Sequence, residues 1–242
     1  MSAANSPGSS PAGAFAAPED RKGTDIWYVG LSVDSRAVAR HEHTLSEDER
    51  KRAGEFRFQH DATRYVVAHG ALREILARYV RREARDLAFS ATPSGKPVLV
   101  SSGAGTGIWF NLAHSADIAL LAVSREGEVG IDVERLNPDL DLPAIARRCF
   151  SPGELKRLAA DPPSLYVENF FTFWTRKEAY VKARGEGLSA PLTEIDVSAS
   201  PALPGGDWVV RDIPVPPDYK GAIATCGGTG SRRSFRYDDL TS

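Results

Sequence analysis

Two spacings of apolar residues recur along the chain, and together they predict an α+β fold. Short runs that alternate or are continuously apolar indicate strands. The expected strands cover residues 25–33, 87–90, 97–100, 107–112, 117–124, 128–134, 193–198, 207–213 and 219–226. Apolar residues three and four positions apart indicate helices instead. The expected helices cover residues 45–52, a long segment from residue 61, and residues 142–149, 151–160 and 170–184.

Local signals mark the ends of several expected helices. Asp61 is placed to cap the long helix. The apolar stripe of that helix consists of Val66, Leu72, Ile75, Leu76 and Tyr79. Ser151-Pro152-x-Glu154 has the form of an N-terminal cap. Gly185 and Gly187 are expected to end the last helix, because glycine adopts the left-handed conformation found at helix C-termini.

The predicted elements fall into two rounds of similar order, each with a strand, then helices, then antiparallel strands. No repeat of the sequence itself accompanies this order. The first 24 or so residues are rich in Ala, Ser, Pro and Gly and lack a basic segment followed by an apolar one. We therefore expect residues 1–24 to be a disordered tail, not a signal peptide.

One carboxylate falls on the apolar face of the last predicted helix. At 3.6 residues per turn, Phe171, Trp174, Glu178 and Val181 share a stripe. A carboxylate there must be paired, metal-bound or protonated, because burying a lone charge costs several kcal/mol or more. Lys182 follows one turn later. The plainer interpretation is a Glu178–Lys182 surface pair, which would contribute only about 0.2–0.5 kcal/mol.

A second acidic pattern lies in the strand expected at 128–134. Val129, Ile131 and Val133 alternate there with polar positions, so Asp132 and Glu134 project from the same face. Like charges in this arrangement repel unless a cation lies between them. An ordinary solvated strand face is the alternative for an isolated Asp-x-Glu. Gly130 would let a ligand approach the backbone closely.

Asp132, Glu134 and Glu178 together would offer hard oxygen ligands. Mg²⁺ suits such a set, because it takes a few carboxylates, keeps some water and completes its shell with substrate phosphate. The chain has no His/Cys cluster with zinc-site spacing, which makes a soft-metal site a poor fit.

These motifs resemble those of the Sfp-type 4′-phosphopantetheinyl transferases, in the holo-[acyl-carrier-protein] synthase superfamily. That family has a Gly-Ile-Asp-x-Glu strand and a Trp-x-x-Lys-Glu-Ala-x-x-Lys helix. Here they stand as residues 130–134 and 174–182, and Gly185-Glu186-Gly187-Leu188 and Pro191-Leu192 follow as in the family. Each motif alone is weak, but the two in order and about forty residues apart are specific.

Two upstream pieces extend the resemblance to roughly residues 25–240. Asn111-Leu112-Ala113-His114-Ser115 is expected to form the turn between two strands, and Gly95-Lys96-Pro97 a loop. In the family such a His and Lys contact coenzyme A, largely through its phosphates. Ala113 departs from the family, where a Ser is frequent, so one hydroxyl contact to the 3′-phosphate is in doubt. Without these neighbours, either piece would read as an ordinary polar loop.

The resemblance also implies a fold and a role for each motif. It implies two similar halves related by pseudo-twofold symmetry, each an antiparallel sheet packed with helices. Residues 25–126 would carry the phosphate-binding elements, residues 127–242 the magnesium and catalytic motifs, and the coenzyme would lie between them. Arg52 and Arg64 are the candidates for phosphate contacts among the basic residues at 50–64, most of which would form a solvated helix face.

The implied reaction is transfer of 4′-phosphopantetheine from coenzyme A to a serine of an apo acyl or peptidyl carrier protein, which leaves adenosine 3′,5′-bisphosphate. Asp132, Glu134 and Glu178 would hold Mg²⁺ against the pyrophosphate. Glu178 is also the candidate base, directly or through water, a use that competes with metal ligation. Lys182 would stabilise the pyrophosphate charge or protonate the leaving group.

The nucleotide end would be held by Arg52, Arg64, Lys96 and His114, with Asp132 and Lys182 also reaching the coenzyme. Trp174 is expected to be structural.

Composition narrows the partners and the location. A net charge of −2 argues against general nucleic-acid binding, and no apolar run approaches the ~18 residues of a membrane span. Cys149 and Cys226 lie far apart without a redox motif, as expected in a reducing cytoplasm. A monomer would suffice if both halves of the site lie in one chain. A carrier surface around Phe150 and Leu165–Phe171 is the initial hypothesis.

Two rival functions use the same residues. A Mg²⁺-dependent pyrophosphohydrolase would use the acidic trio but need no carrier, and it would release phosphopantetheine into solution. A catalytically silent coenzyme-binding module would not need Glu178 and Lys182 beside a metal. Which carriers would be served, and in fatty-acid, polyketide or non-ribosomal peptide synthesis, does not follow from the sequence.

Overall fold

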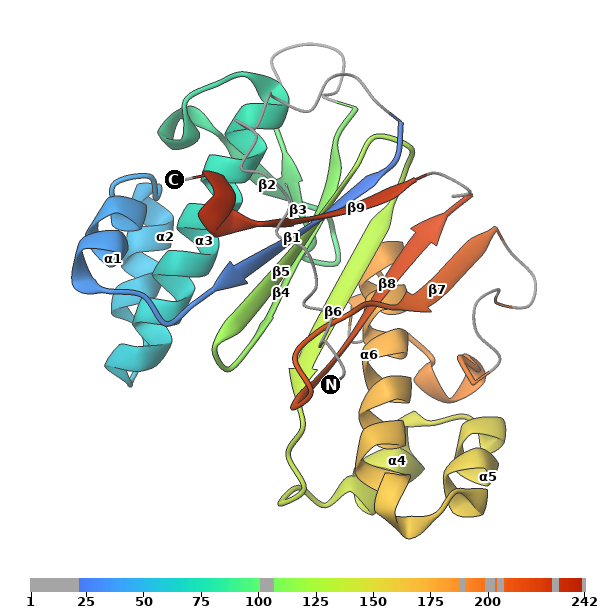
Figure 1. Cartoon of the computed structure of the whole chain (residues 1–242). Helices are drawn as coiled ribbons and strands as arrows, with labels where there is room; N and C mark the ends of the chain where they lie inside the picture. The colour runs from blue at the N-terminus through green and yellow to red at the C-terminus, as the bar shows by residue number, and fades with distance from the viewer. Residues whose placement is uncertain are drawn as a thin grey trace, which may run out of the picture.

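A computed structural model describes residues 22–100, 107–187, 190–198, 203, 207–227 and 231–240 (Figure 1). Most of the expected N-terminal tail, and Leu188 of the expected motif, lie outside these residues. Helices and antiparallel sheets divide between two parts of the chain, as the α+β prediction requires. Among the described helices, none combines the length and the apolar character needed to cross a membrane.

The first half contains a helical layer against a sheet. Its elements are β1 (Thr24–Gly30), α1 (Ser35–Glu42), α2 (Glu47–Gly54), α3 (Gln59–Val80), β2 (Phe89–Ala91), β3 (Pro97–Leu99), β4 (Trp109–Ser115) and β5 (Ile118–Ser124). The second half continues directly from it. Its elements are β6 (Val129–Arg135), α4 (Leu142–Cys149), α5 (Pro152–Ala160), α6 (Tyr166–Arg184), β7 (Trp208–Asp212) and β8 (Tyr219–Cys226).

The two halves repeat one topology. In the first, a strand is followed by three helices and a hairpin, and the last strand β5 pairs antiparallel with both β4 and β1. In the second, β8 pairs antiparallel with both β7 and β6 in the same way. Apart from the small β2–β3 hairpin of the first half, both described halves therefore have the same order of helices and sheet strands and the same pairing among those strands. This confirms the predicted duplicated α+β architecture, although the sequence shows no repeat.

A final strand, β9 (Arg232–Arg236), returns to the first sheet and pairs parallel with β1. The Arg233 guanidinium donates to both carboxylate oxygens of Asp25 at 2.7 and 2.8 Å. The Phe235 ring stacks on Trp27 with centroids 4.7 Å apart. The expected second half covered residues 127–242. Its last strand, β9, belongs structurally to the first sheet instead. No pattern in the sequence predicts this strand.

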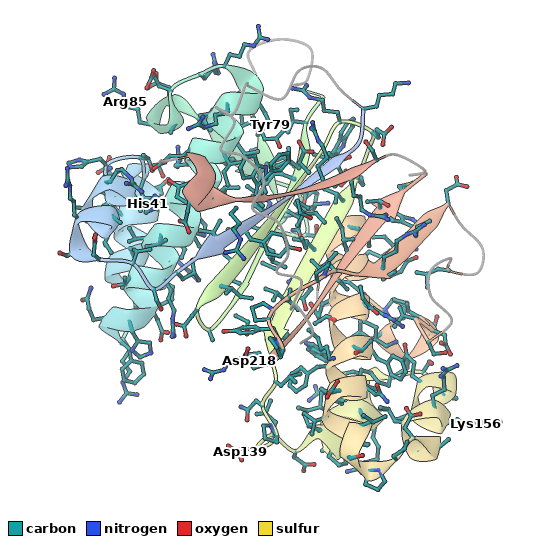
Figure 2. The ribbon with its side chains drawn as sticks, in the orientation of Figure 1. His41, Tyr79, Arg85, Asp139, Lys156 and Asp218 are labelled. Atoms are coloured by element: carbon teal, nitrogen blue, oxygen red, sulfur yellow. The ribbon has the colours of Figure 1, made fainter. Side chains whose placement is uncertain are left out.

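Among the described residues, three apolar clusters hold the elements together. One lies between α3 and the first sheet, where the hydroxyl of Tyr79 (Figure 2) donates to Asp25 at 2.6 Å. A second lies between α6 and the second sheet. The third joins the halves, because the opposite faces of β1, β4 and β5 pack against β6 and β8. Its buried members include Ile26, Leu120, Ile131 and Ile223.

Several local predictions were wrong. Residues 111–115 form most of β4, not a turn, and Asp61 lies in the first turn of α3, whose N-cap is Phe58. Helix α1 was not predicted. Residues 193–198 do not form a strand; a 3₁₀ turn covers Leu192–Glu194. Val197 is buried there, but its amide donates to Glu154 at 2.9 Å and so pairs with a side chain instead of a neighbouring strand.

Equivalent capping boxes anchor the second helix of each half. Ser46 and Glu49 cap α2, as Ser151 and Glu154 cap α5, which confirms the predicted cap at Ser151. Each capping glutamate also pairs with a cation on the long helix of its half. Arg73 Nε contacts Glu49 at 2.6 Å and Lys177 Nζ contacts Glu154 at 2.8 Å. The second pair is almost fully buried, and burial raises the pKa of Glu154 and lowers that of Lys177.

Glu49→Gln is expected to lower the free energy of unfolding at pH 7 by about 2–3 kcal/mol. Burial alone would raise the pKa of Glu49, but hydrogen bonds from His69, the Ser46 amide and Arg73 lower it to about 2. A depressed carboxyl pKa stabilises the fold above the unfolded value near 4.3, and this contribution is lost as pH falls toward 2. Urea unfolding of both proteins at pH 7 and pH 3 checks this. A gap that does not narrow at pH 3 would contradict it.

Candidate functional site

The strand β6 places its two acidic side chains opposite the core between the halves. Val129, Ile131 and Val133 are buried in that core, as the alternation predicted. Asp132 and Glu134 therefore project toward α6. Asp132 is 2% exposed, and Lys182 Nζ of α6 donates to its Oδ1 at 2.5 Å.

The helix α6 lies directly on β6 because Gly130 has no side chain. A Cβ at Gly130 would come within 2.1 Å of the Ala179 carbonyl oxygen and 2.3 Å of the Ala183 amide nitrogen. The close approach expected at this glycine is therefore made by a helix backbone, not by a ligand. This contact brings Glu178 and Lys182 over the acidic face of β6.

Gly130→Ala is expected to destabilise the fold by about 2–3 kcal/mol or more, because neither backbone can move without separating α6 from β6. The same shift should also displace Lys182 from Asp132. Thermal unfolding measures the loss of stability, with Gly54→Ala as the control. A Cβ at Gly54 meets nothing within 4 Å. Wild-type stability in Gly130→Ala would contradict the packing described.

The carboxylates of Asp132, Glu134 and Glu178 influence one another electrostatically. Burial raises the pKa of all three. The negative charge of Asp132 raises the pKa of Glu134 and Glu178 further, and Lys182 opposes each rise. The α6 and β6 motifs, predicted separately, therefore form one site. Lys182 pairs across to β6, so it is not simply the surface partner of Glu178.

This acidic site suits a divalent cation that substrate helps to hold. Asp132 Oδ2 is buried and has no hydrogen-bond partner among the described residues. Within the described ranges, no three His, Cys, Asp or Glu side chains form a metal cage by themselves. Magnesium does not need one, since it usually binds one or two carboxylates together with substrate phosphates. The orphan oxygen of Asp132 and the repulsion among the three carboxylates fit such an ion.

The predicted coenzyme-binding cations surround this site unequally. Lys96 Nζ donates to Glu128 at 2.6 Å, to the Ala183 carbonyl at 2.9 Å and to the Val129 carbonyl at 3.2 Å. It thus fastens the first half to the start of β6 and the end of α6. Gly185 ends α6 there with φ of 66°, as predicted.

Arg64, His114 and Arg52 lie in the first half. Arg64 pairs with Asp117 at 2.8 Å, across the turn that follows β4. His114 is exposed on β4, and partial desolvation of its ring together with the nearby His69, Lys182 and Arg64 lowers its pKa. His114 is therefore close to cations from both halves. Arg52 is exposed, and within the part of the chain that the structure describes it forms no ion pair.

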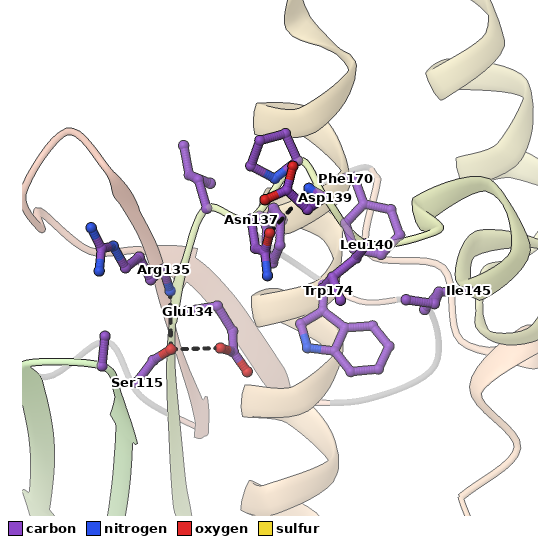
Figure 3. A pocket seen from close by; sticks show the side chains of 13 residues that line it. Ser115, Glu134, Arg135, Asn137, Asp139, Leu140, Ile145, Phe170 and Trp174 are labelled. Atoms are coloured by element: carbon purple, nitrogen blue, oxygen red, sulfur yellow. Dashed lines mark hydrogen bonds between the residues drawn. The ribbon is translucent and has the colours of Figure 1, made fainter. Parts of the chain in front are cut away.

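A cavity of about 620 Å³ opens beside Glu134 (Figure 3). Leu140, Ile145 and Trp174 line its apolar part. Its polar lining comes from Ser115, Glu134, Arg135, Asn137 and Asp139. The Trp174 ring stacks on Phe170 with centroids 6.2 Å apart. Trp174 therefore packs its helix as predicted, but it also forms part of the cavity wall.

Comparison with known proteins agrees with this geometry. Residues 35–126 match a family model for the N-terminal part of 4′-phosphopantetheinyl transferases, and residues 128–205 match the 4′-phosphopantetheinyl transferase superfamily. The 4′-phosphopantetheinyl transferase HetI of Nostoc sp. (strain PCC 7120) is 35% identical over 215 residues, which cover 87% of this chain and 90% of HetI. The chain belongs to the 4′-phosphopantetheinyl transferase family.

Other members of the family are similar over most of their length. The 4′-phosphopantetheinyl transferase psf-1 of Bacillus pumilus is 33% identical, with 75% of this chain and 78% of psf-1 covered. The 4′-phosphopantetheinyl transferase Sfp of Bacillus subtilis (strain 168) is 28% identical, with 74% and 81% covered. These matches include both halves, so the resemblance found in the short motifs extends through the fold.

In this family member, three residues near the site were missed by sequence reasoning. Asn111 and Ser115 accept hydrogen bonds from amides of β6, and His69 lies close enough to His114 to contribute to its lowered pKa. His69 could have been found, since it lies on the same helix as Arg64. Nothing along the sequence indicates the other two contacts, because they join strands of different sheets.

The hypothesis for a carrier surface needs correction. Phe150, Phe170 and Phe171 are at most 4% exposed and belong to the core of the second half, whereas Leu165 is 43% exposed. An aromatic cluster that packs α4 and α6 together cannot also be the exposed surface. Of the residues in that hypothesis, Leu165 is the large apolar side chain that remains on the surface.

Proposed function

We propose that this chain transfers the 4′-phosphopantetheine moiety of coenzyme A to a serine hydroxyl of an apo acyl or peptidyl carrier protein, with Mg²⁺ as cofactor. The product is the holo carrier, and adenosine 3′,5′-bisphosphate leaves, as in the holo-[acyl-carrier-protein] synthase reaction. The observation that carries the proposal is the buried Asp132, with one oxygen on Lys182 and the other unpartnered, beside Glu134 and Glu178. Family membership supports the reaction class.

The reaction is a displacement at phosphorus. The serine oxygen forms a bond to the phosphorus next to pantetheine, while the bond from that phosphorus to the bridging oxygen of the pyrophosphate breaks, and this oxygen leaves on the 5′-phosphate of adenosine 3′,5′-bisphosphate. Positioning and charge neutralisation supply most of the catalysis in such transfers. When bound, Mg²⁺ would screen the pyrophosphate charge and stabilise the charge that develops on the leaving oxygen. Asp132, Glu134 and Glu178 are the residues that would hold it.

Glu178 is the candidate acceptor of the serine proton. Its pKa is raised by burial and by Asp132, which makes the carboxylate a better base than an exposed glutamate. Lys182 lies on the same helix one turn further on, and its side chain is 32% exposed where it pairs with Asp132. It would stabilise negative charge on the pyrophosphate and supply a proton to the leaving oxygen.

The nucleotide end of coenzyme A would lie against the first half. Arg64 and Lys182 both lower the pKa of His114, so the three side chains lie near one another. Lys96 would reach phosphate only by exchanging its Glu128 contact, and Arg52 would approach from the exposed α2. The cavity beside Glu134 would take the pantetheine end, because its apolar wall suits a chain without charge.

Detection of adenosine 3′,5′-bisphosphate by chromatography tests this function. Its release should require coenzyme A, Mg²⁺ and an apo carrier together, and it should stop when the carrier serine is replaced by alanine. Release without a carrier would instead support the pyrophosphohydrolase. Coenzyme binding without any release would support the silent binding module. The proposal further places the enzyme in the cytoplasm as a monomer that binds neither nucleic acid nor membrane, consistent with its net charge of −2.

A further inference from the structure

Side chains join the two sheets where β4 lies beside β6 (Figure 1). The Ile131 amide donates to Asn111 Oδ1 at 2.8 Å, and the Arg135 amide donates to Ser115 Oγ at 3.1 Å. Both pairs are separated by 20 residues, so the two strands run in the same direction in one register. The strands belong to different sheets. These two contacts therefore help to fix how the halves meet.

Asp132 and Glu134 lie between these two points of attachment. Asn111 is 6% exposed, so its oxygen satisfies an amide that would otherwise be buried without a partner. The register of the acidic face is thereby tied to β4. His114, the predicted phosphate contact, is the neighbour of Ser115 on that strand. The nucleotide-binding strand and the acidic strand are held in one fixed alignment.

Ser115 makes a second contact that Asn111 does not. Its hydroxyl also lies 2.8 Å from Glu134 Oε2, and both contacts appear as dashed lines in Figure 3. A hydroxyl has one donor and two acceptor positions. Ser115 donates to the carboxylate and accepts from the Arg135 amide, so both uses are compatible. The Arg135 amide thus holds the Ser115 hydroxyl in place, and that hydroxyl in turn orients the Glu134 carboxylate.

We propose that Ser115 is a positioning residue, which orients the Glu134 carboxylate toward a divalent cation shared with Asp132. This inference rests on the proposed function, because the cation is the one used in transfer. Groups that hydrogen-bond a metal-ligating carboxylate fix its orientation, and their loss typically weakens metal binding by 10–100-fold. Ser115 belongs to the first half and Glu134 to the second. The contact therefore couples metal binding to the junction between the halves.

Binding of Mn²⁺, followed by electron paramagnetic resonance in the presence of coenzyme A, tests the proposal without turnover. Ser115→Ala removes the hydroxyl and is expected to raise the Kd for Mn²⁺ about tenfold. Ser115→Thr keeps the hydroxyl and should return the Kd to within about twofold of wild type. Affinity for coenzyme A without metal should be the same in all three proteins.

Ser124→Ala is the matched control. Ser124 is a buried serine at the opposite end of the same β4–β5 hairpin, and its hydroxyl accepts from the Glu126 amide at 3.2 Å. It should bind Mn²⁺ as wild type does. Equal Mn²⁺ affinity in Ser115→Ala and wild type would overturn the positioning role, as would weakening in Ser115→Thr as large as in Ser115→Ala. Failure of the wild type to bind Mn²⁺ with coenzyme A would overturn the proposed metal-dependent function itself.

Discussion

Replacing Asp132 by asparagine is expected to lower carrier modification by about 10³-fold or more without weakening the fold. Asparagine keeps the shape of the side chain but removes the charge that would neutralise Mg²⁺ and pair with Lys182. The pKa of Asp132 is raised by burial, so its ionised form is disfavoured in the folded state. A neutral amide should therefore give equal or higher thermal stability. Turnover by mass spectrometry and thermal unfolding by circular dichroism measure both effects.

Asp212→Asn provides the control for this change. Asp212 also pairs with a cation of α6, Arg176, at 2.6 Å, but it is 53% exposed and outside the acidic site. Its variant should retain nearly full activity. Full activity in Asp132→Asn would contradict the metal site, and a large loss of stability would contradict the electrostatic interpretation of the buried charge.

Glu178→Gln is expected to lower kcat by about 10²–10⁴-fold, the usual contribution of a general base. The KM for coenzyme A should change little, because the carboxylate would act on the serine proton and not on the nucleotide. Single-turnover kinetics at saturating Mg²⁺ separate these effects. Glu168→Gln is the control, since Glu168 lies on the same helix and pairs with Lys220 at 2.9 Å. It should leave kcat unchanged.

The same experiment separates the two uses of Glu178. If Glu178 acts only as a metal ligand, high Mg²⁺ should restore most of the rate of Glu178→Gln. A rate that stays low at every Mg²⁺ concentration supports the role as base. Recovery to near wild-type kcat would contradict that role and leave the metal site intact.

Elements with strong local patterns could be predicted from sequence. The bounds of α4 and β8 match the structure, and the capping box at Ser151 is present as expected. In these segments the apolar spacing and the end signals act within a few residues. The acidic positions of β6 and α6 were predicted for the same reason, since each follows from the period of its own element.

Elements that depend on a distant partner could not be predicted in this way. Strand β9 has a single large apolar residue, Phe235, and its position depends on Trp27 and on the Arg233–Asp25 pair. Residues 193–198 have the alternation of a strand, but Glu154 takes the Val197 amide. The polar stretch at 111–115 looked like a turn because nothing nearby in the sequence shows that Asn111 and Ser115 accept hydrogen bonds from β6 in the other sheet.

In the candidate site too, the position of each residue on its own element was predictable, whereas the contacts between elements were not. Sequence spacing placed Asp132 and Glu178 on their own elements, but only the packing of α6 on Gly130 shows why they meet. The resemblance indicated Lys96 as a phosphate contact, whereas the structure shows its ammonium group bonded to Glu128 and two carbonyls. Such contacts depend on how the two halves pack, and no period along the chain records that packing.

Intact-mass spectrometry of an apo carrier protein, incubated with this protein, coenzyme A and Mg²⁺, tests the central claim most directly. The account predicts that the carrier gains the mass of one phosphopantetheinyl group at its serine. The gain should disappear with EDTA, in Asp132→Asn, and in a carrier whose serine is replaced by alanine. No mass gain on acyl and peptidyl carriers, from a folded protein that binds coenzyme A, would contradict it.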